Sequence, residues 1–419
     1  MRSSVGACLA LLALAGAAHA DRAEIGGHTK LNVLAGTYPD DSLIRDVIGA
    51  SSLDGQGEFR LNFEWRQGGF SADAAYQVFA LAGDTLALGN RLPPGGVNGS
   101  IPSLPDDRRR LFDLTKVISD SEDHALLHRI DRAWVGHSGE RHVVRFGRQA
   151  LSWGNGLFYA PMDLVNPFDP STIDTEYKFG DDLLYGQYLR ESGDDIQAAI
   201  VFRRNVETGD VEREQATTAI KYHGFSDALE YDLLIAEHYD ELVVGVGGGR
   251  DIGGALVRAD LVLSDTEDEL VAQFVANLSY SWVAAGRNMS GALEYHYNGF
   301  GQSGGNYSAE ALAENPDLVA RVARGQLFTL GRHYAAASVL IEMTPLWTVT
   351  PILLTNLGDP SGLVQLTTQL SLGDNLTVTG SLNVPIGASG TEFGGIETEI
   401  PGRYLASGPG LFAQIAWYF

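Results

Sequence analysis

The sequence predicts an all-β protein, a transmembrane antiparallel β-barrel of about eighteen strands with long extracellular loops and short periplasmic turns. Three observations support this fold class. Apolar and polar residues alternate in runs of about ten residues, and glycine is abundant, at 50 residues. Beyond residue 20, no stretch approaches the ~20 apolar residues that a membrane-spanning helix needs.

Residues 1–20 have the pattern of an export signal. Arg2 supplies a positive charge, an apolar run follows, and Ala18 and Ala20 provide small residues before a cleavage site at Asp21. The only cysteine, Cys8, lies within the apolar run. We therefore expect residues 21–419 to form the barrel without a disulfide or a thiolate site.

The chain is acidic, with a formal net charge of −24. This charge disfavours a nucleic-acid partner. The excess acid either keeps exposed loops soluble, or attracts divalent cations at a lipopolysaccharide surface or biases a pore towards cations.

The clearest strands lie near the C-terminus. In 376–384, leucine and valine occupy one face while threonine, serine and asparagine occupy the other. Around Arg132 the alternation breaks, which predicts a β-bulge, and the glycine-rich run 242–252 specifies its register weakly. The same alternation predicts strands at 29–37, 57–66, 70–79, 124–137, 140–151, 182–191, 195–203, 214–223, 229–239, 242–252, 254–264, 269–283, 287–299, 333–344, 347–357, 363–372, 376–385 and 410–419.

The connections between these strands fall into two sets. Turns of a few residues alternate with connections that include every long loop, at 38–56, 80–123, 152–181, 300–332 and 386–409. This asymmetry is typical of outer-membrane barrels, with the short turns in the periplasm. Two long loops are expected to contain short helices, at 106–118 and 309–324.

Aromatic residues give an independent indication of the topology. Five of the six tryptophans fall at the periplasmic ends of predicted strands, where an indole ring suits the membrane boundary. These are Trp65, Trp134, Trp282, Trp347 and Trp417. The last strand ends on Phe419, which resembles the sorting signal read by the barrel-assembly machinery, so that machinery is an expected partner.

Motifs for chemistry are weak. Gly301 to Gly305 match the G-x-S-x-G nucleophile elbow of serine hydrolases at Ser303, but a glycine-rich loop produces such a match easily. The histidines have no metal-ligand spacing, so we expect no metal and no cofactor. Glu294 and His296 share one strand face, which suits either a ligand or proton site or an ordinary polar wall.

Charged residues of both signs are predicted to face the lumen. They form either cross-strand ion pairs that brace a wide wall or opposed ladders that orient a polar solute. The basic residues are Arg60, Arg66, Arg141, Arg145, Arg203, Lys221 and Arg258, and the acidic ones are Glu64, Asp73, Glu230, Asp232, Asp260, Glu294 and Glu342.

The loop 152–181 has an unusual composition. It is rich in aromatic residues and prolines, which exposes too much apolar surface for a loop in water. We expect it to fold inward and narrow the lumen, with Trp153, Phe158 and Tyr159 on the wall and Asp163 and Asn166 facing the passage. The alternative is a loop that only caps the rim.

The start of this loop also carries a resemblance. Residues 147–170 read GRQ…SWG…P.DL.NPF.P and resemble a group of proteobacterial outer-membrane proteins similar to the porin and alginate-export-like barrels. The resemblance implies a barrel of about eighteen strands that passes or exports polar solutes. Alginate exporters have an arginine-lined bore, whereas the predicted lumen here carries as much acid as base, which speaks against alginate.

These observations together predict a passive outer-membrane channel with no chemical step, surrounded by lipid and lipopolysaccharide. A barrel of this size leaves room for water in its lumen. Arg108 to Arg110 are expected to contact lipopolysaccharide phosphates or an anionic solute. The alternatives are a gated barrel for export or envelope assembly with a periplasmic partner, and an outer-membrane hydrolase using Ser303.

Overall fold

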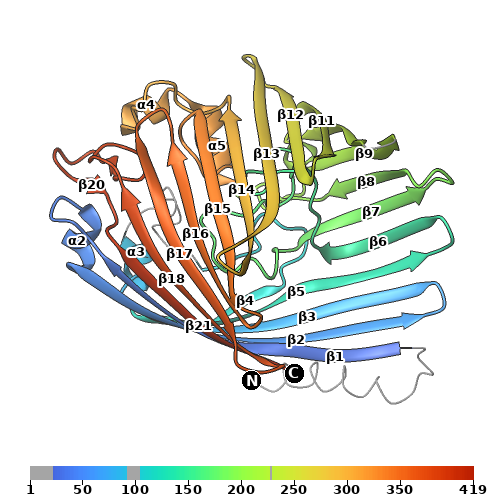
Figure 1. Cartoon of the computed structure of the whole chain (residues 1–419), viewed down its shortest axis with the longest axis horizontal. Helices are drawn as coiled ribbons and strands as arrows, with labels where there is room; N and C mark the ends of the chain where they lie inside the picture. The colour runs from blue at the N-terminus through green and yellow to red at the C-terminus, as the bar shows by residue number, and fades with distance from the viewer. Residues whose placement is uncertain (1–21, 92–103, 227–228) are drawn as a thin grey trace.

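The computed structural model describes residues 22–91, 104–226 and 229–419, so the predicted export signal lies outside the described residues. Eighteen antiparallel strands follow one another around a closed barrel, in which the first strand pairs with both the second and the last (Figure 1). They are β1 (Arg22–Thr37), β2 (Ser51–Gln67), β3 (Phe70–Gly83), β5 (His124–Ser138), β6 (His142–Gln149), β7 (Asp181–Leu189), β8 (Asp195–Val201), β9 (Thr217–Ser226), β10 (Leu229–His238), β11 (Glu241–Ile252), β12 (Ala255–Asp265), β13 (Leu270–Ala284), β14 (Arg287–Asn298), β15 (His333–Thr344), β16 (Trp347–Asn356), β17 (Ser361–Ser371), β18 (Leu376–Ile386) and β21 (Gly410–Tyr418). Every predicted strand is present, and the predicted fold class is confirmed.

The two faces of the wall have opposite character. On β1, Leu31 is 60% exposed and faces outward, whereas its neighbour Lys30 is 2% exposed and faces the lumen. Exposed leucine, isoleucine and valine continue around the outside, for example Leu233 and Ile235 on β10. An apolar exterior around a polar interior is the arrangement that lipid outside and water inside require. None of the helices in the described ranges is both long and apolar enough to cross a membrane.

A nineteenth strand, β4 (Thr115–Asp120), corrects the helix predicted at 106–118. Residues Ala133 to Ser138 of β5 pair with β6. Because β6 is short, it leaves the edge of β5 before Ala133 without a partner. Thr115 to Asp120 pair with this edge opposite Arg129 to Ala125. The unpaired edge offers backbone hydrogen bonds, and these decide the conformation of the segment.

The predicted bulge in β5 is confirmed. Ala75 pairs with Arg132 and Tyr76 pairs with Ile130, so Asp131 has no partner across the strand. The extra residue turns Asp131 towards the lumen, where it lies among three arginines.

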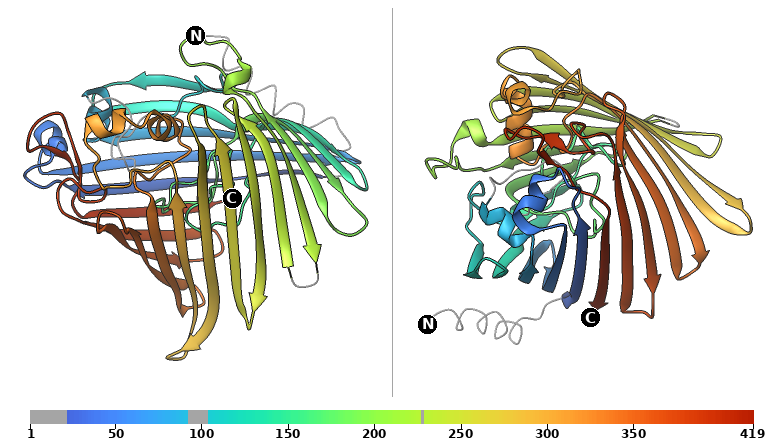
Figure 2. Two further views of the ribbon diagram at one scale, coloured as in Figure 1. Left: turned by 90° about the horizontal axis from the view of Figure 1, so that it is seen from above. Right: turned by 90° about the vertical axis from the view of Figure 1, so that its left-hand side faces the viewer.

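The long loops gather at one end of the barrel and the short turns at the other (Figures 1 and 2). The long loops carry α2 (Leu43–Ile48), α3 (Leu86–Arg91), α4 (Ala309–Ala313), α5 (Pro316–Ala323) and the hairpin β19 (Ile396–Glu397) and β20 (Tyr404–Leu405). The two helices α4 and α5 confirm the prediction for 309–324.

All five tryptophans predicted at the short-turn end lie there, but one of them faces the lumen. The bulge at Asp131 shifts the alternation of β5, so Trp134 pairs across the sheet with Asp73 on the inner face. Its ring lies 4.7 Å from the Arg145 guanidinium. Trp134 therefore is not part of an external aromatic belt.

Candidate functional site

The connection between β6 and β7, here called the inner segment (residues 150–180), lies inside the barrel. Trp153 and Met162 are buried in a cluster with inward side chains of five successive strands, β8 to β12, among them Ala199 and Leu234. The Trp153 indole Nε1 donates a hydrogen bond to Gln197 Oε1 at 2.7 Å. The segment therefore begins by packing against the wall.

Glycines on the inner face of β11 make room for this packing. A side chain at Gly247 would meet Asp260 Oδ1 at 2.1 Å, and one at Gly245 would meet Met162 Cε at 3.1 Å. The Asn155 amide, backbone and side chain, donates to both oxygens of Asp260, at 2.6 and 2.7 Å. The sequence predicted only that these glycines specify the register of β11 weakly. In the structure they allow the inner segment to approach the wall closely.

Glu294 on β14 binds the next part of the inner segment. Its carboxylate accepts three consecutive backbone N–H groups, from Leu157 at 2.6 Å, Phe158 at 2.9 Å and Tyr159 at 2.7 Å. The Tyr159 ring stacks on His296, with 4.8 Å between centroids and an interplanar angle of 11°. Burial and the nearby carboxylate of Glu392 raise the pKa of the Tyr159 hydroxyl well above its ordinary value.

The returning half of the inner segment contacts the opposite wall. The Gln365 side chain on β17 donates to the Ser171 carbonyl oxygen at 2.9 Å. Asp174 accepts hydrogen bonds from Lys30 on β1 at 2.6 Å and from Gln414 on β21 at 2.8 Å. The inner segment is thus held by side chains on both sides of the lumen.

A buried ion pair joins the end of the inner segment to its first half. Lys178 Nζ lies 2.5 Å from Asp163 Oδ2 and donates to the Leu151 carbonyl oxygen at 2.6 Å. Burial raises the pKa of Asp163 to about 6 and lowers the pKa of Lys178. Asp163 therefore does not face the passage, contrary to the prediction, because it is needed as the charge partner of Lys178. Asn166 is half-buried at a positive φ of 52° and donates to the Phe179 carbonyl oxygen.

The predicted lumen residues divide into two groups by their contacts. Asp260, Glu294 and His296 contact the inner segment. Arg60 pairs with the bulged Asp131 at 2.9 Å and lies over the Tyr177 ring of the inner segment at 4.1 Å.

The second group has partners within the wall or at its rim. Arg203 pairs with Asp181, Glu64 with Arg66 on the same strand, and Glu342 accepts from Asn288. Arg145 lies over Trp134, and Arg258 is half-buried on β12, where its side chain lies beside Gly249. Arg141 corrects the prediction, because it precedes β6 and pairs with Glu191 between two short turns.

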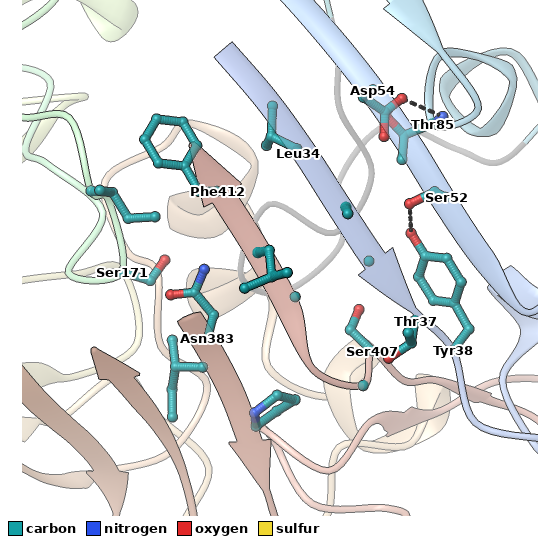
Figure 3. A pocket seen from close by; sticks show the side chains of 18 of the residues that line it. Leu34, Thr37, Tyr38, Ser52, Asp54, Thr85, Ser171, Asn383, Ser407 and Phe412 are labelled. Atoms are coloured by element: carbon teal, nitrogen blue, oxygen red, sulfur yellow. Dashed lines mark hydrogen bonds between the residues drawn. The ribbon is translucent and has the colours of Figure 1, made fainter. Parts of the chain in front are cut away.

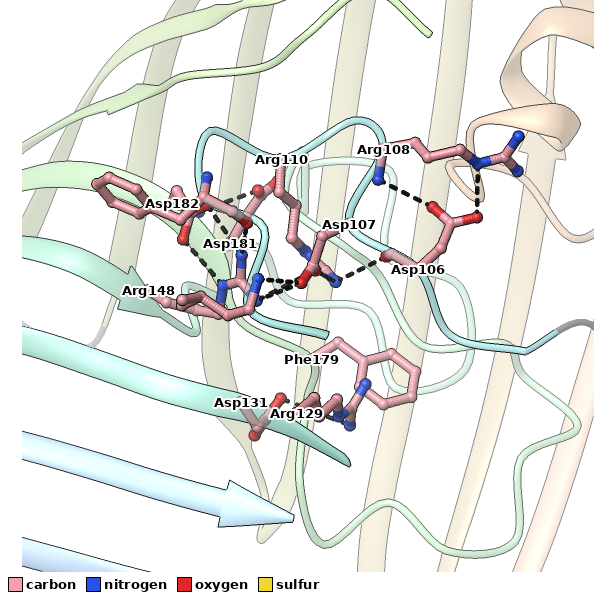
Figure 4. A network of polar contacts seen from close by, with 12 residues as sticks. Asp106, Asp107, Arg108, Arg110, Arg129, Asp131, Arg148, Phe179, Asp181 and Asp182 are labelled. Carbon is pink, nitrogen blue, oxygen red and sulfur yellow. Dashed lines mark hydrogen bonds and ion pairs between the residues drawn. The ribbon is translucent and has the colours of Figure 1, made fainter. Parts of the chain in front are cut away.

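A buried ionic network holds the segment before β4 against the wall, and the sequence analysis did not find it (Figure 4). Arg148, 1% exposed, binds Asp107 at 3.1 Å and Asp182 at 2.9 Å. Arg110, opposite it, lowers the pKa of Asp107. The only available signal was Arg148 itself, an arginine next to the predicted inward loop.

The arginines expected to contact lipopolysaccharide are mostly paired. Arg108 binds Asp106 at 2.9 Å, and Arg110 binds Asp107 at 2.7 Å. Arg109 is half-buried, and among the described residues no ion pair is recorded for it.

The loops at the far end pack into a cover over the mouth, defined here as α2 to α5 and the hairpin β19–β20. Ile396 of the hairpin is buried with Leu318 of α5 and Phe300. Leu405 of the hairpin packs on Ile44 of α2 and Leu88 of α3. One apolar contact surface therefore joins loops from both sides of the barrel.

The G-x-S-x-G match lies in this cover. Ser303 is exposed, and no hydrogen bond from a histidine or carboxylate to its hydroxyl occurs in the described part of the chain. Gln302 of the motif forms an isolated bridge with Gly331, and α4 begins only at Ala309. The geometry lacks the strand–turn–helix that gives a nucleophile elbow its reactivity.

Comparisons with known proteins were made on sequence and on structure. No protein-family model and no curated protein match the sequence. Among solved structures, Acinetobacter baumannii OccAB4 is similar with a TM-score of 0.55 and 7% identity, over 96% of this chain and 99% of that chain. OccAB2 of the same organism has a TM-score of 0.51 and 11% identity, over 96% and 98%. A mutant of the Rh. blastica porin matches with a TM-score of 0.45 and 7% identity, over 95% and 100%.

The likeness to the two Acinetobacter structures concerns the fold. It agrees with the strand order and the apolar exterior in defining a porin-like β-barrel.

Proposed function

We propose that the protein is an outer-membrane channel through which small polar solutes diffuse, with a lumen narrowed by the inner segment. The observation that carries this proposal is the position of residues 150–180, bound to inward side chains on opposite walls of a barrel with an apolar exterior. A barrel of eighteen strands leaves an aqueous space that its own side chains do not fill. A bound segment across that space determines which solutes fit.

Single-channel recording in planar lipid bilayers tests the channel. We expect discrete open steps from the purified protein. Deleting 153–170 should raise the conductance, because that segment crosses the lumen. An unchanged conductance would contradict the narrowing.

A thiol-labelling experiment tests the same narrowing in a protein that keeps the whole inner segment. The only natural cysteine is Cys8, inside the predicted export signal. Ser171→Cys places one thiol on the inner segment, and Glu397→Cys places a control thiol on the exposed hairpin. A bulky thiol reagent should lower the conductance of Ser171→Cys only. Equal effects on both variants would contradict a narrowing by the inner segment.

A gated barrel is the second candidate, and the cover favours it. The apolar contacts that join Leu405 to α2 and α3 would have to separate if the mouth opens widely. Such a barrel would show no spontaneous open steps, and it would conduct after the cover is removed by deleting 390–405. A periplasmic partner for export or assembly, and recognition of Phe419 by the assembly machinery, remain proposals from the sequence.

A further inference from the structure

The extracellular half of the lumen contains a cavity of about 500 Å³, here called the chamber. Its wall consists of β1 to β3 on one side and β17, β18 and β21 on the other (Figure 3). Ser171 and Ile173 of the inner segment, Phe393 of the loop before β19, and Ile396 and Leu405 of the cover also line the chamber. A volume of about 300–1,000 Å³ is usual for small-molecule sites.

The wall of the chamber is apolar where a barrel lumen is ordinarily polar. Leu34 on β1 lies directly opposite Phe412 on β21, and both belong to the inner face. Leu81 on β3 and Leu363 on β17 extend the apolar surface to either side. Leu34 remains 40% exposed in this position. Large apolar side chains left exposed in an aqueous passage mark a surface that binds apolar groups.

Charged side chains are few in the lining of the chamber. Lysine and arginine are absent from its lining in the described residues. Asp54 accepts two hydrogen bonds from Thr85, at 2.8 and 2.9 Å. Glu392 is buried and accepts from the Leu330 amide at 2.8 Å and from Asn356 at 2.7 Å. Glu392 is thus held by the protein, and Asp54 is held through one of its two carboxylate oxygens.

Neutral hydrogen-bonding groups lie at the chamber's lower edge. Gln56, Gln365 and Asn383 line it. Gln56 and Asn383 thus offer uncharged amide groups to a solute in the chamber.

We propose that the chamber binds uncharged amphiphilic solutes, with an apolar ring against Leu34, Phe412 and Leu363 and hydroxyl groups towards Gln56 and Asn383. This inference rests on the proposed function and names the class of solute that the channel selects. Selection by size alone would not distinguish an amphiphilic solute from a polar one. The apolar wall of the chamber does, because it binds the apolar half of the solute.

Calorimetric titration of the purified full-length mature protein in detergent tests the inference without requiring conduction. Phenyl β-D-glucoside and methyl β-D-glucoside are the probes, because they share the sugar and differ in the apolar group. We expect phenyl glucoside to bind about tenfold more tightly, which corresponds to about 1.4 kcal/mol. Leu34→Gln combined with Phe412→Gln should abolish this preference. Leu340→Gln, an equally exposed leucine on the inner face of β15, should retain it.

Bilayer recording on the same samples separates the two claims. Open steps together with equal binding of the two glucosides would overturn the chamber and leave the channel standing. Preferential phenyl glucoside binding without open steps would support the chamber and overturn the channel. A loss of preference in Leu340→Gln as large as in the double variant would also overturn the chamber, because the preference would then not depend on its wall.

Discussion

Replacing Glu294 by glutamine should release the middle of the inner segment. The carboxylate accepts three consecutive backbone N–H groups of the inner segment, and Asn277 donates to it at 3.1 Å. Glutamine has the same shape, but its NH₂ group would face donors, so at least one buried N–H group would lose its acceptor. A hydrogen bond to a charged group contributes about 1.5–3 kcal/mol. Loss of one or two such bonds would shift the equilibrium between bound and released segment by about 3 kcal/mol, or about a hundredfold.

Single-channel recording measures this release directly. We expect Glu294→Gln to show a higher conductance or rapid fluctuation between two levels, as the segment leaves the wall. Glu342→Gln is the matched control, because Glu342 is an exposed lumen carboxylate that accepts a hydrogen bond from Asn288 on the wall and not from the inner segment. A Glu294→Gln trace identical to that of the wild type would refute the role of these three hydrogen bonds. So would equal changes in both variants.

Three further predictions concern stability and pH. Asp163→Asn should destabilise the folded protein by about 3–5 kcal/mol, because Lys178 would remain buried and unpaired. The double variant Asp163→Leu with Lys178→Met should cost much less, because no buried charge remains. Thermal unfolding followed by circular dichroism compares the two variants. Arg148→Met should cost a similar amount, because the buried Asp182 would lose its arginine and Asp107 would keep only Arg110. The exposed Arg66→Met should change stability by about 0–1 kcal/mol, and equal melting temperatures of the two variants would contradict the network. Burial raises the pKa of Glu392 to about 7, so its folded state holds a proton more tightly than the unfolded state. The packing of the cover should therefore be strongest below the ordinary pKa of glutamate and weaken as the pH rises to about 7; anisotropy of a fluorophore on Glu397→Cys should follow this change, and Glu392→Gln should remove it.

The sequence alone determined the barrel. Alternation with a period of two has a direct physical cause, because successive side chains of a strand face lipid and water in turn. The same alternation located the bulge near Arg132, since one extra residue exchanges the two faces. Aromatic and proline content also predicted that 152–181 lies inside, because its apolar surface must leave water.

Only the tertiary structure decided which charged groups meet. Asp163 was predicted to face the passage, but Lys178, fifteen residues further on, returns to it when the segment folds back. β4 became a strand because β6 ends early and leaves an edge of β5 unpaired. The glycines of β11 were read as a weak register, yet they leave space for Asn155 and Met162. Alternation fixes which face a side chain occupies, whereas its partners depend on segments that are distant in the chain and meet only when the barrel closes.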